Sequence, residues 1–402
     1  MDSISSSVIA TQSAGLLLNG DPMGREELFE KMYDRMNSDI LSKKYDAVVK
    51  KKVTFIIVSI LLTLIVSIVA LSLGPTNIPL SDTFKTLVNC VVDIFSDVPS
   101  MYHDVIVNTR MPRILMAIVV GGSLAAAGCI MQGILRNPLV SPFTLGVSTA
   151  AAFGAGLSIV YGVMIFGSFY SLKFSLFDFT FSGSSIVSIL FAFFFGLISI
   201  SFVLIMSRKE NASKSTLVLS GVVISYIFQA GLSFLKYISD DSSLRDITLW
   251  TMGNLWSASW ASFWIVIPVV LICMVYLEKI SIDINTLASG VDVAKNLGID
   301  VAKLRMRGLL VCTILTCTCI AFTGAIGFIG LMAPHICRRI IGNDNRYLLP
   351  ASIIIGGLIL LISDTVSRTV FSTDVPVGIL IYLIGGAFFI WMVIKKGWRD
   401  ES

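Results

Sequence analysis

Two arginines, Arg110 and Arg113, flank Pro112 and could bind carboxylates. Residues three apart share one face of a helix, and proline suits the first helical turn, so both guanidinium groups would point the same way. Arg368, which follows Asp364 by four residues, is a third basic residue of this kind. The pattern fits a docking site for acidic side chains of an external partner. It also fits arginines at helix ends that reach toward lipid headgroups.

A stiff turn follows the second apolar stretch. It runs from Gln132 to Pro142 and contains two prolines, which restrict the backbone. Asn137 within it could cap a helix or plug a passage, and the segment could equally be an ordinary rigid turn.

A short amphipathic pattern occupies the longest internal loop, residues 278–307. Val291, Ala294 and Leu297 recur on one helical face, and Gly298 is a suitable residue to end the helix. Such a helix could transmit the motion of a soluble partner, or it could lie among lipid headgroups.

Metal and enzyme chemistry have little support in the residue types. The chain has two histidines, His103 and His335, and none of its seven cysteines forms a CxxC pair. Cysteines in apolar runs act as small packing residues. The phosphate-binding pattern Gly-x-x-x-x-Gly-Lys-[Ser/Thr] does not occur. We therefore predict no catalytic residue, no metal site and no cofactor, and we expect ATP hydrolysis, if used, to occur in a separate subunit.

The elements that must position these residues are membrane helices. The chain of 402 residues is 55% hydrophobic and 14% charged, whereas a soluble domain carries about 25% charged residues. A spanning helix needs roughly 20 apolar residues. We predict an all-α polytopic membrane protein with about ten transmembrane helices, tightly packed through small residues. The predicted spans are residues 53–74, 111–134, 143–166, 184–206, 215–235, 260–278, 308–326, 327–342, 347–367 and 376–394.

Lysine and arginine set the predicted orientation. With the N-terminus inside and an even number of spans, most of the 30 Lys and Arg residues lie in inside segments, as the positive-inside rule requires. We predict a multi-pass protein of the cell membrane with both termini in the cytoplasm and no nucleic-acid partner. The basic residues left outside are Lys85, Arg110, Arg113, Lys173, Lys236, Arg245 and Arg368.

Residues 1–50 are predicted to form a cytoplasmic extension before the transmembrane domain at 53–396. Residues 1 to about 24 are rich in Ser, Gly and Thr and are expected to be disordered. Residues 24–50 place apolar side chains at helical spacing between charged ones, which predicts an amphipathic helix. This helix could bind the membrane interface or a partner, or it could be a solvated leader.

Several motifs occur together over residues 53–396. They are Arg110-Met-Pro-Arg113, Gln132-Gly133, Asn137-Pro138-Leu139, Pro142, Leu145-Gly146-Val147-Ser148, Trp250-x-x-Gly253-x-Leu255, Ala294-x-x-Leu297-Gly298, Gly324 to His335 with Arg338, and Pro350, Asp364, Arg368 and Pro376-Val377-Gly378-Ile379. This set resembles the permease family of iron-siderophore, haem and cobalamin uptake systems, the type II ABC importers. The sequence departs from the family where Asp374 and Val375 precede Pro376, because the family has Glu before its Pro-Val-Gly.

The resemblance implies a type II ABC importer permease fold and a homodimer of ten-helix permeases. Two ATPase subunits would dock from the cytoplasm, and an external substrate-binding protein would dock outside. The family's docking arginines map onto Arg110, Arg113 and Arg368.

The resemblance also assigns the two inside segments. It makes Asn137 and Leu139 part of a cytoplasmic gate, and it makes Ala294, Leu297 and Gly298 part of the loop that couples ATPase motion to the helices.

The implied cargo is an iron(III)-siderophore-type metal chelate, which is the commonest substrate of the family. Cobalamin, haem or an oxyanion are alternatives within the same class. An ion-driven carrier or a passive channel is the alternative from another class, although few ionisable residues lie at membrane depth to serve such a carrier.

Overall fold

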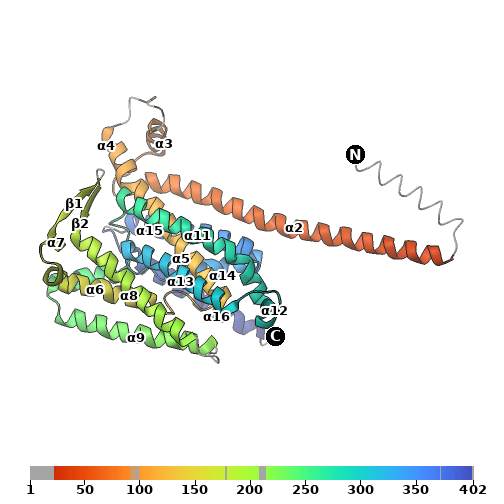
Figure 1. The fold of residues 1–402 in the computed structure, drawn as a ribbon. Helices are drawn as coiled ribbons and strands as arrows, with labels where there is room; N and C mark the ends of the chain where they lie inside the picture. Colours follow the sequence, from red (N-terminus) through yellow and green to blue (C-terminus); the bar gives the residue numbers. More distant parts are fainter. Residues whose placement is uncertain are drawn as a thin grey trace. The chain divides into compact units, whose positions relative to one another are not determined.

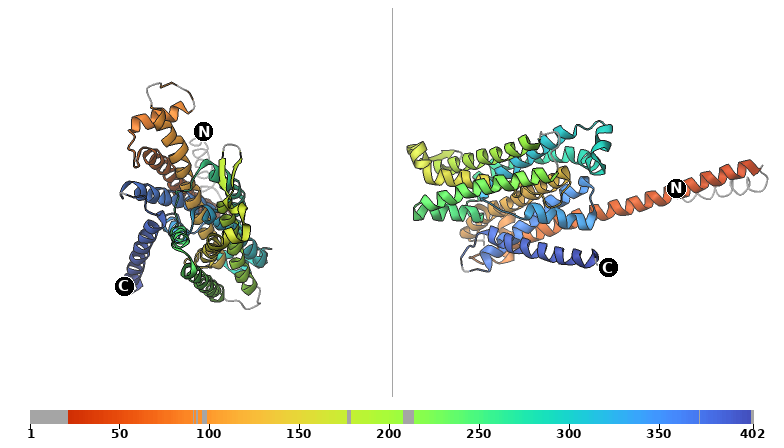
Figure 2. Two further views of the ribbon diagram at one scale, coloured as in Figure 1. Left: turned by 90° about the vertical axis from the view of Figure 1, so that its left-hand side faces the viewer. Right: turned by 90° about the horizontal axis from the view of Figure 1, so that it is seen from below.

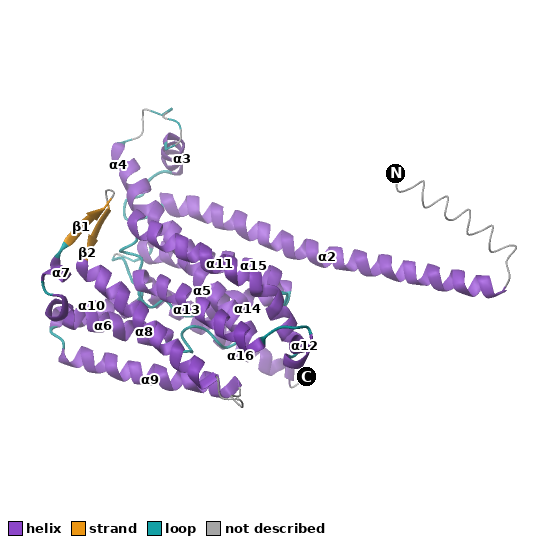
Figure 3. Cartoon of the chain, viewed as in Figure 1, coloured by secondary structure: helices purple, strands orange, loops and turns teal. Residues whose placement is uncertain are grey.

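The computed structural model describes residues 22–90, 92, 94–95, 99–176, 179–207, 214–371 and 373–400. Within these residues every regular element is a helix except for one hairpin, as Figure 3 shows. The predicted all-α membrane class is confirmed. Helices suit this composition because they satisfy their own backbone hydrogen bonds where the bilayer offers no water.

Figure 1 follows the elements along the chain. The long ones are α2 (Pro22–Ser72), α5 (Met111–Leu135), α6 (Val147–Phe166), α8 (Gly183–Ser207), α9 (Lys214–Ile238), α11 (Trp260–Ser289), α13 (Val301–Thr323), α15 (Asn345–Thr369) and α16 (Val377–Asp400). The shorter ones are α3 (Leu80–Asn89), α4 (Ser100–His103), the π-helix η1 (Asp104–Arg110), α7 (Ser168–Ser171), α10 (Asp241–Met252), α12 (Val291–Asn296) and α14 (Ile329–Ile341). The strands β1 (Lys173–Leu176) and β2 (Phe179–Ser182) pair antiparallel.

Each predicted span coincides with one described helix. Eight helical stretches among the described residues are long and apolar enough to cross a membrane, and α16 adds a shorter apolar stretch, Val377–Met392. The remaining predicted span, residues 327–342, corresponds to α14, which has 13 residues. It rises about 20 Å, less than the roughly 30 Å hydrocarbon core.

Packing divides the chain into two compact units, Met1–Thr54 and Phe55–Ser402, and α2 contributes to both. The helix expected over residues 24–50 is part of α2. Residues 1–21, where disorder was predicted, lie outside the described residues. The proposed division of function between 1–50 and 53–396 stays a prediction. The following description concerns the second unit.

Helix α5 is the centre of this unit. Its small residues let other backbones come close: a Cβ atom added to Gly128 would lie 1.8 Å from the carbonyl oxygen of Gly330 in α14. One added to Gly121 would lie 2.3 Å from that of Gly356 in α15. The tight packing predicted from small residues is therefore found where α5 crosses α14 and where it crosses α15.

The break between α13 and α14 is braced by neighbouring loops. Gly324 and Phe328 both have left-handed backbone conformations, with φ of 69° and 59°. The N–H of Asn254 donates to the carbonyl of Thr323 at 2.8 Å, and the N–H of Ala325 donates to a carbonyl at the end of α10 at 3.3 Å. These bonds satisfy backbone groups that the interrupted helix leaves unpaired.

The short elements gather at two opposite ends of the bundle. Figure 1 shows β1, β2 and α7 at one end and α12 at the other, and the left view of Figure 2 looks onto the end with the two strands. Helix α5 runs between these ends, and its 25 residues rise about 37 Å. The residues just before Met111 and those just after Leu135 therefore lie at opposite ends of the bundle.

Candidate functional site

Three arginines and two aspartates form a cluster where α5 begins. Arg110 ends η1, Arg113 lies in the first turn of α5, Asp364 and Arg368 lie near the end of α15, and Asp374 precedes α16. The structure thus brings together the three arginines predicted from the sequence. We call these five residues the arginine cluster.

Arg113 is held between two carboxylates. Its Nε atom donates to Asp364 Oδ1 at 2.9 Å, while Nη1 and Nη2 donate to the two Asp374 oxygens at 2.6 and 3.0 Å. The exposed fraction of the side chain is 14% for Arg113, 0% for Asp364 and 35% for Asp374. Paired, charge-assisted bonds of this kind fix the orientation of a guanidinium group. Asp374 is the partner that solvent and other molecules can reach.

Arg110 and Arg368 bind the end of the first long helix. Arg110 Nη1 donates to the carbonyls of Leu71 and Ser72 at 2.6 and 2.9 Å, and Arg368 Nη1 donates to the carbonyl of Leu73 at 2.8 Å. Both arginines are buried. The last carbonyls of a helix lack partners within the helix and carry partial negative charge, so two guanidinium groups stabilise this terminus. The docking role of these two residues stays a prediction, and capping α2 is a second role that sequence reasoning missed.

The turn after α5 is shaped by Asn137. Arg136 ends α5 in the left-handed conformation, with φ of 49°. The side-chain oxygen of Asn137 then accepts the N–H of Leu139 at 3.0 Å, which forms an Asx turn. Leu139 is 57% exposed. Asn137 thus fixes the conformation of the turn, and the side chain of Leu139 in this turn is exposed.

The predicted coupling segment is a short helix with a well-defined end. The N–H of Gly298 donates to the carbonyl of Lys295 at 2.9 Å, and the N–H of Ile299 donates to that of Ala294 at 3.0 Å. These two bonds form a Schellman motif, which needs a left-handed residue such as Gly298, with φ of 84°. The expected helix stop at Gly298 is confirmed.

The segment differs from the prediction in two respects. Helix α11 continues to Ser289 and α13 already begins at Val301, so the connection is shorter than residues 278–307. Ala294 is buried, but Leu297 is 69% exposed and does not share its face. The helical periodicity ends at Asn296, and the Schellman turn carries Leu297 outward.

Asp300 fixes the start of the next helix. Its carboxylate accepts the N–H of Lys303 at 3.0 Å as the N-cap of α13. The hydrogen bond from this backbone N–H lowers the pKa of Asp300, with smaller help from the Lys303 side chain. The predicted coupling segment thus has a defined structure, because α12 ends in a Schellman motif and α13 begins at the N-cap Asp300.

No group of three or more His, Cys, Asp or Glu side chains in the described part of the chain could hold a metal ion. The arginine cluster can bind carboxylates, and Leu297 offers an apolar contact at the opposite end of the bundle.

The comparisons with known proteins identify the class and the family. The chain is 36% identical over 356 residues to an ABC transporter permease protein of Methanocaldococcus jannaschii, covering 88% of this chain and 98% of the relative. It is 37% identical over 337 residues to the hemin transport system permease protein HmuU of Yersinia pestis, covering 83% and 94%. It is thus an ABC transporter permease subunit and no enzyme. The FecCD transport family model matches residues 61–395, and the chain belongs to this family.

A solved structure supports the same fold. An inward-facing metal-chelate type ABC transporter superposes with a TM-score of 0.69 at 31% identity, covering 85% of this chain and 99% of that one. The resemblance stated from the motifs is confirmed. Other relatives are named as permeases for Fe(3+)-citrate, molybdate and cobalamin.

Sequence reasoning missed α10 and the hairpin at the arginine end of the bundle. The signal for α10 was local: Asp240 accepts the N–H groups of Ser242 and Ser243 as an N-cap. Its 12 residues are too short and too polar to register as a span. The hairpin has 4 residues in each strand and offered no alternating pattern long enough to predict.

Proposed function

We propose that this chain is the permease of an importer that moves an iron(III)-siderophore-type metal chelate into the cytoplasm. A substrate-binding protein would deliver the chelate outside, two ATPase subunits would drive transport from inside, and a second copy of the chain would complete the pathway. The observation that carries this proposal is the placement of the arginine cluster and the exposed Leu297 at opposite ends of one bundle. An importer needs both contacts, one on each side.

The proposed cycle is alternating access. Closure of the ATPase subunits would press on the segment Val291–Ile299 and shift α11 and α13, to which it is joined. Because α5 packs against both α11 and α13 and leads into the turn at Asn137 and Leu139, this shift would reach that turn. The two states differ in the ATPase contacts, and this difference supplies the free energy of the switch. In this proposal the termini lie in the cytoplasm.

The test is ATP-driven uptake into liposomes. The permease would be reconstituted with the ATPase and the binding protein encoded beside it, and an iron(III) hydroxamate would be supplied with the binding protein. We expect uptake that requires ATP inside and the binding protein outside. Uptake without nucleotide, or uptake lost only when an ion gradient is collapsed, would favour a channel or an ion-driven carrier instead. Parallel assays with haem, cobalamin and molybdate decide the cargo.

Docking through Arg113 predicts an unusual gain of affinity. Asp374 occupies the exposed side of Arg113, so an incoming carboxylate must displace it. Asp374→Asn should therefore tighten docking of the binding protein about tenfold at low salt, with a smaller gain at high salt. The measurement is the dissociation constant at two ionic strengths. Asp300→Asn, at the opposite end, is the control. Unchanged docking by Asp374→Asn would remove Arg113 from the docking surface.

The proposed gate predicts a leak. Asn137→Ala removes the acceptor that holds the turn, and a lost hydrogen bond of this kind costs about 1 kcal/mol. We expect the variant to release chelate preloaded in liposomes severalfold faster without ATP. Ser100→Ala, at the other end of the bundle, should leave the leak unchanged. If the Asn137→Ala variant releases chelate no faster than the wild type, this turn does not close the pathway.

A further inference from the structure

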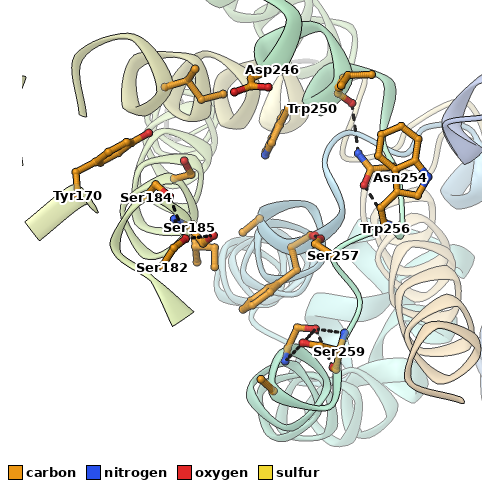
Figure 4. Close-up of a pocket in the computed structure, with 18 of the residues that line it drawn as sticks. Tyr170, Ser182, Ser184, Ser185, Asp246, Trp250, Asn254, Trp256, Ser257 and Ser259 are labelled. Atoms are coloured by element: carbon orange, nitrogen blue, oxygen red, sulfur yellow. Dashed lines mark hydrogen bonds between the residues drawn. The ribbon is translucent and has the colours of Figure 1, made fainter. Parts of the chain in front are cut away.

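A cavity of about 740 Å³ with a mixed polar and apolar lining opens at the end of the bundle that carries the hairpin. Figure 4 shows it between the short helix α10, the start of α8 and the loop that leads from α10 to α11. Its volume is within the roughly 300–1,000 Å³ typical of small-molecule sites. All of its walls belong to one copy of the chain. It is separate from the arginine cluster, because none of those five residues lines it.

Serine hydroxyls dominate the polar lining. Eight serines border the cavity, and Figure 4 shows Ser182, Ser184 and Ser185 together on one side of it. Ser182 Oγ lies 2.9 Å from Ser184 Oγ and 2.7 Å from Ser185 Oγ. A hydroxyl offers one donor and two acceptor positions. Ser182 Oγ also accepts the N–H of Ser185 at 3.1 Å, so its three positions are used, whereas Ser184 and Ser185 keep hydrogen-bonding capacity for a ligand.

The lining has almost no net charge. Among the described residues that border the cavity, Lys173 and Asp246 are the two charged ones, and their charges are opposite. Trp250 and Trp256 add aromatic surface, and Trp256 is 40% exposed. Apolar and polar surface thus face the same space. This composition suits a ligand that is uncharged, rich in oxygen and apolar on some of its faces.

The wall of the cavity is bonded to the broken helix pair. Ser257 Oγ donates to the carbonyl of Phe322 at 3.1 Å, and the N–H of Asn254 donates to that of Thr323. Both donors belong to the loop that lines the cavity. A ligand that contacts this loop would therefore act on the segment between α13 and α14.

We propose that this cavity binds an uncharged, oxygen-rich metal chelate in each copy of the permease, before the chelate enters the pathway. The proposal rests on the importer function above and narrows its substrate class. A multiply charged anion would need several cationic donors, but the lining offers one lysine, Lys173, together with one carboxylate, Asp246. A purely apolar ligand would cover the hydroxyls of Ser184 and Ser185 without using their remaining hydrogen-bonding capacity, which is costly. A chelate whose ligands neutralise the metal meets both requirements.

The experiment is direct binding to the full-length permease in phosphatidylcholine nanodiscs. Equilibrium dialysis would compare a neutral iron(III) trihydroxamate with iron(III) citrate and molybdate. We expect the neutral chelate to bind at least about tenfold more tightly than either anion. Ser185→Trp, at an exposed position of the wall, should weaken neutral-chelate binding by about tenfold or more, because the indole fills the cavity. Ser100→Trp places the same ring on the same end outside the cavity and should bind as the wild type does.

A charge variant gives an independent result. Ser185→Lys should improve iron(III) citrate binding about tenfold. It should weaken binding of the neutral chelate less than Ser185→Trp does. Equal binding of neutral and anionic chelates, or unchanged binding by Ser185→Trp, would overturn the proposal. Binding of an alkyl glycoside in the absence of any chelate binding would also overturn it, because the cavity would then take a glycolipid headgroup.

Uptake by the complete complex separates this inference from the proposed function. If the wild-type complex transports a chelate in an ATP-dependent manner but the permease alone binds none, only the cavity proposal fails. If the permease binds the neutral chelate but the complex never transports a metal chelate, the proposed function fails instead, and with it the assignment of this cavity to substrate.

Discussion

Replacing Asp364 with alanine should destabilise the permease by about 3–5 kcal/mol, the usual effect of removing one partner from a buried ion pair. The Asp364 side chain is 0% exposed and pairs with Arg113 at 2.8 Å and Arg368 at 3.6 Å. Its loss leaves the buried Arg368 without a carboxylate partner and leaves Arg113 with Asp374 alone. Because Arg368 also holds the end of α2, the damage should spread to the first helix.

The measurement is the thermal unfolding of the purified permease in detergent. Asp374→Ala is the matched control, because its carboxylate binds the same Arg113 but is 35% exposed. An exposed pair contributes about 1 kcal/mol or less. Asp364→Asn keeps an oxygen acceptor and should fall between the two. If Asp364→Ala and Asp374→Ala lower the unfolding temperature equally, burial does not determine how much each ion pair contributes to the stability of the permease.

Leu297→Glu should reduce ATP-dependent uptake at least about tenfold while the permease stays folded. The side chain is 69% exposed and lies just after the helix Val291–Asn296. An exposed leucine on a rigid turn suits a hydrophobic pocket on a soluble partner, and loss of such an anchor often costs about 2 kcal/mol or more. A glutamate would also introduce a charge that the pocket cannot solvate.

The readouts are uptake into liposomes and co-purification of the ATPase subunits. Lys295→Gln changes an exposed residue on the same short helix and should leave both nearly unchanged, since rim charges contribute little affinity. Thermal unfolding checks that Leu297→Glu remains folded, which we expect because the side chain makes few internal contacts. Normal uptake by a well-folded Leu297→Glu variant would place the ATPase contact elsewhere.

Much of the helix plan could be predicted from the sequence because apolar length alone selects a spanning helix. Every predicted span coincides with a helix. The predicted boundary between the spans 308–326 and 327–342 agrees with the break between α13 and α14, but the groups that hold this break were not predictable. They are the carbonyl of Trp250 and the N–H of Asn254, which lie 75 and 69 residues before the groups that they bind.

The turn at Asn137 and the segment Val291–Ile299 were predicted in part, because their structure is local. Gly298 ends its helix as expected, since the Schellman motif involves only neighbouring residues. The exposure of Leu297 and the burial of Ala294 were not predictable from periodicity, because the helix ends one residue before Leu297. Asn137 was recognised as a turn residue, whereas its bond to the N–H of Leu139 required coordinates.

For the arginine cluster, the sequence by itself determined which charged residues exist and that Arg113 follows Arg110 by one helical turn. Only the tertiary structure decided their partners. Arg110 and Arg368 bind carbonyls of α2, and Arg113 binds Asp364 and Asp374. The physical reason is that a guanidinium group away from water must find acceptors, and the nearest ones are brought by packing from helices distant in the chain.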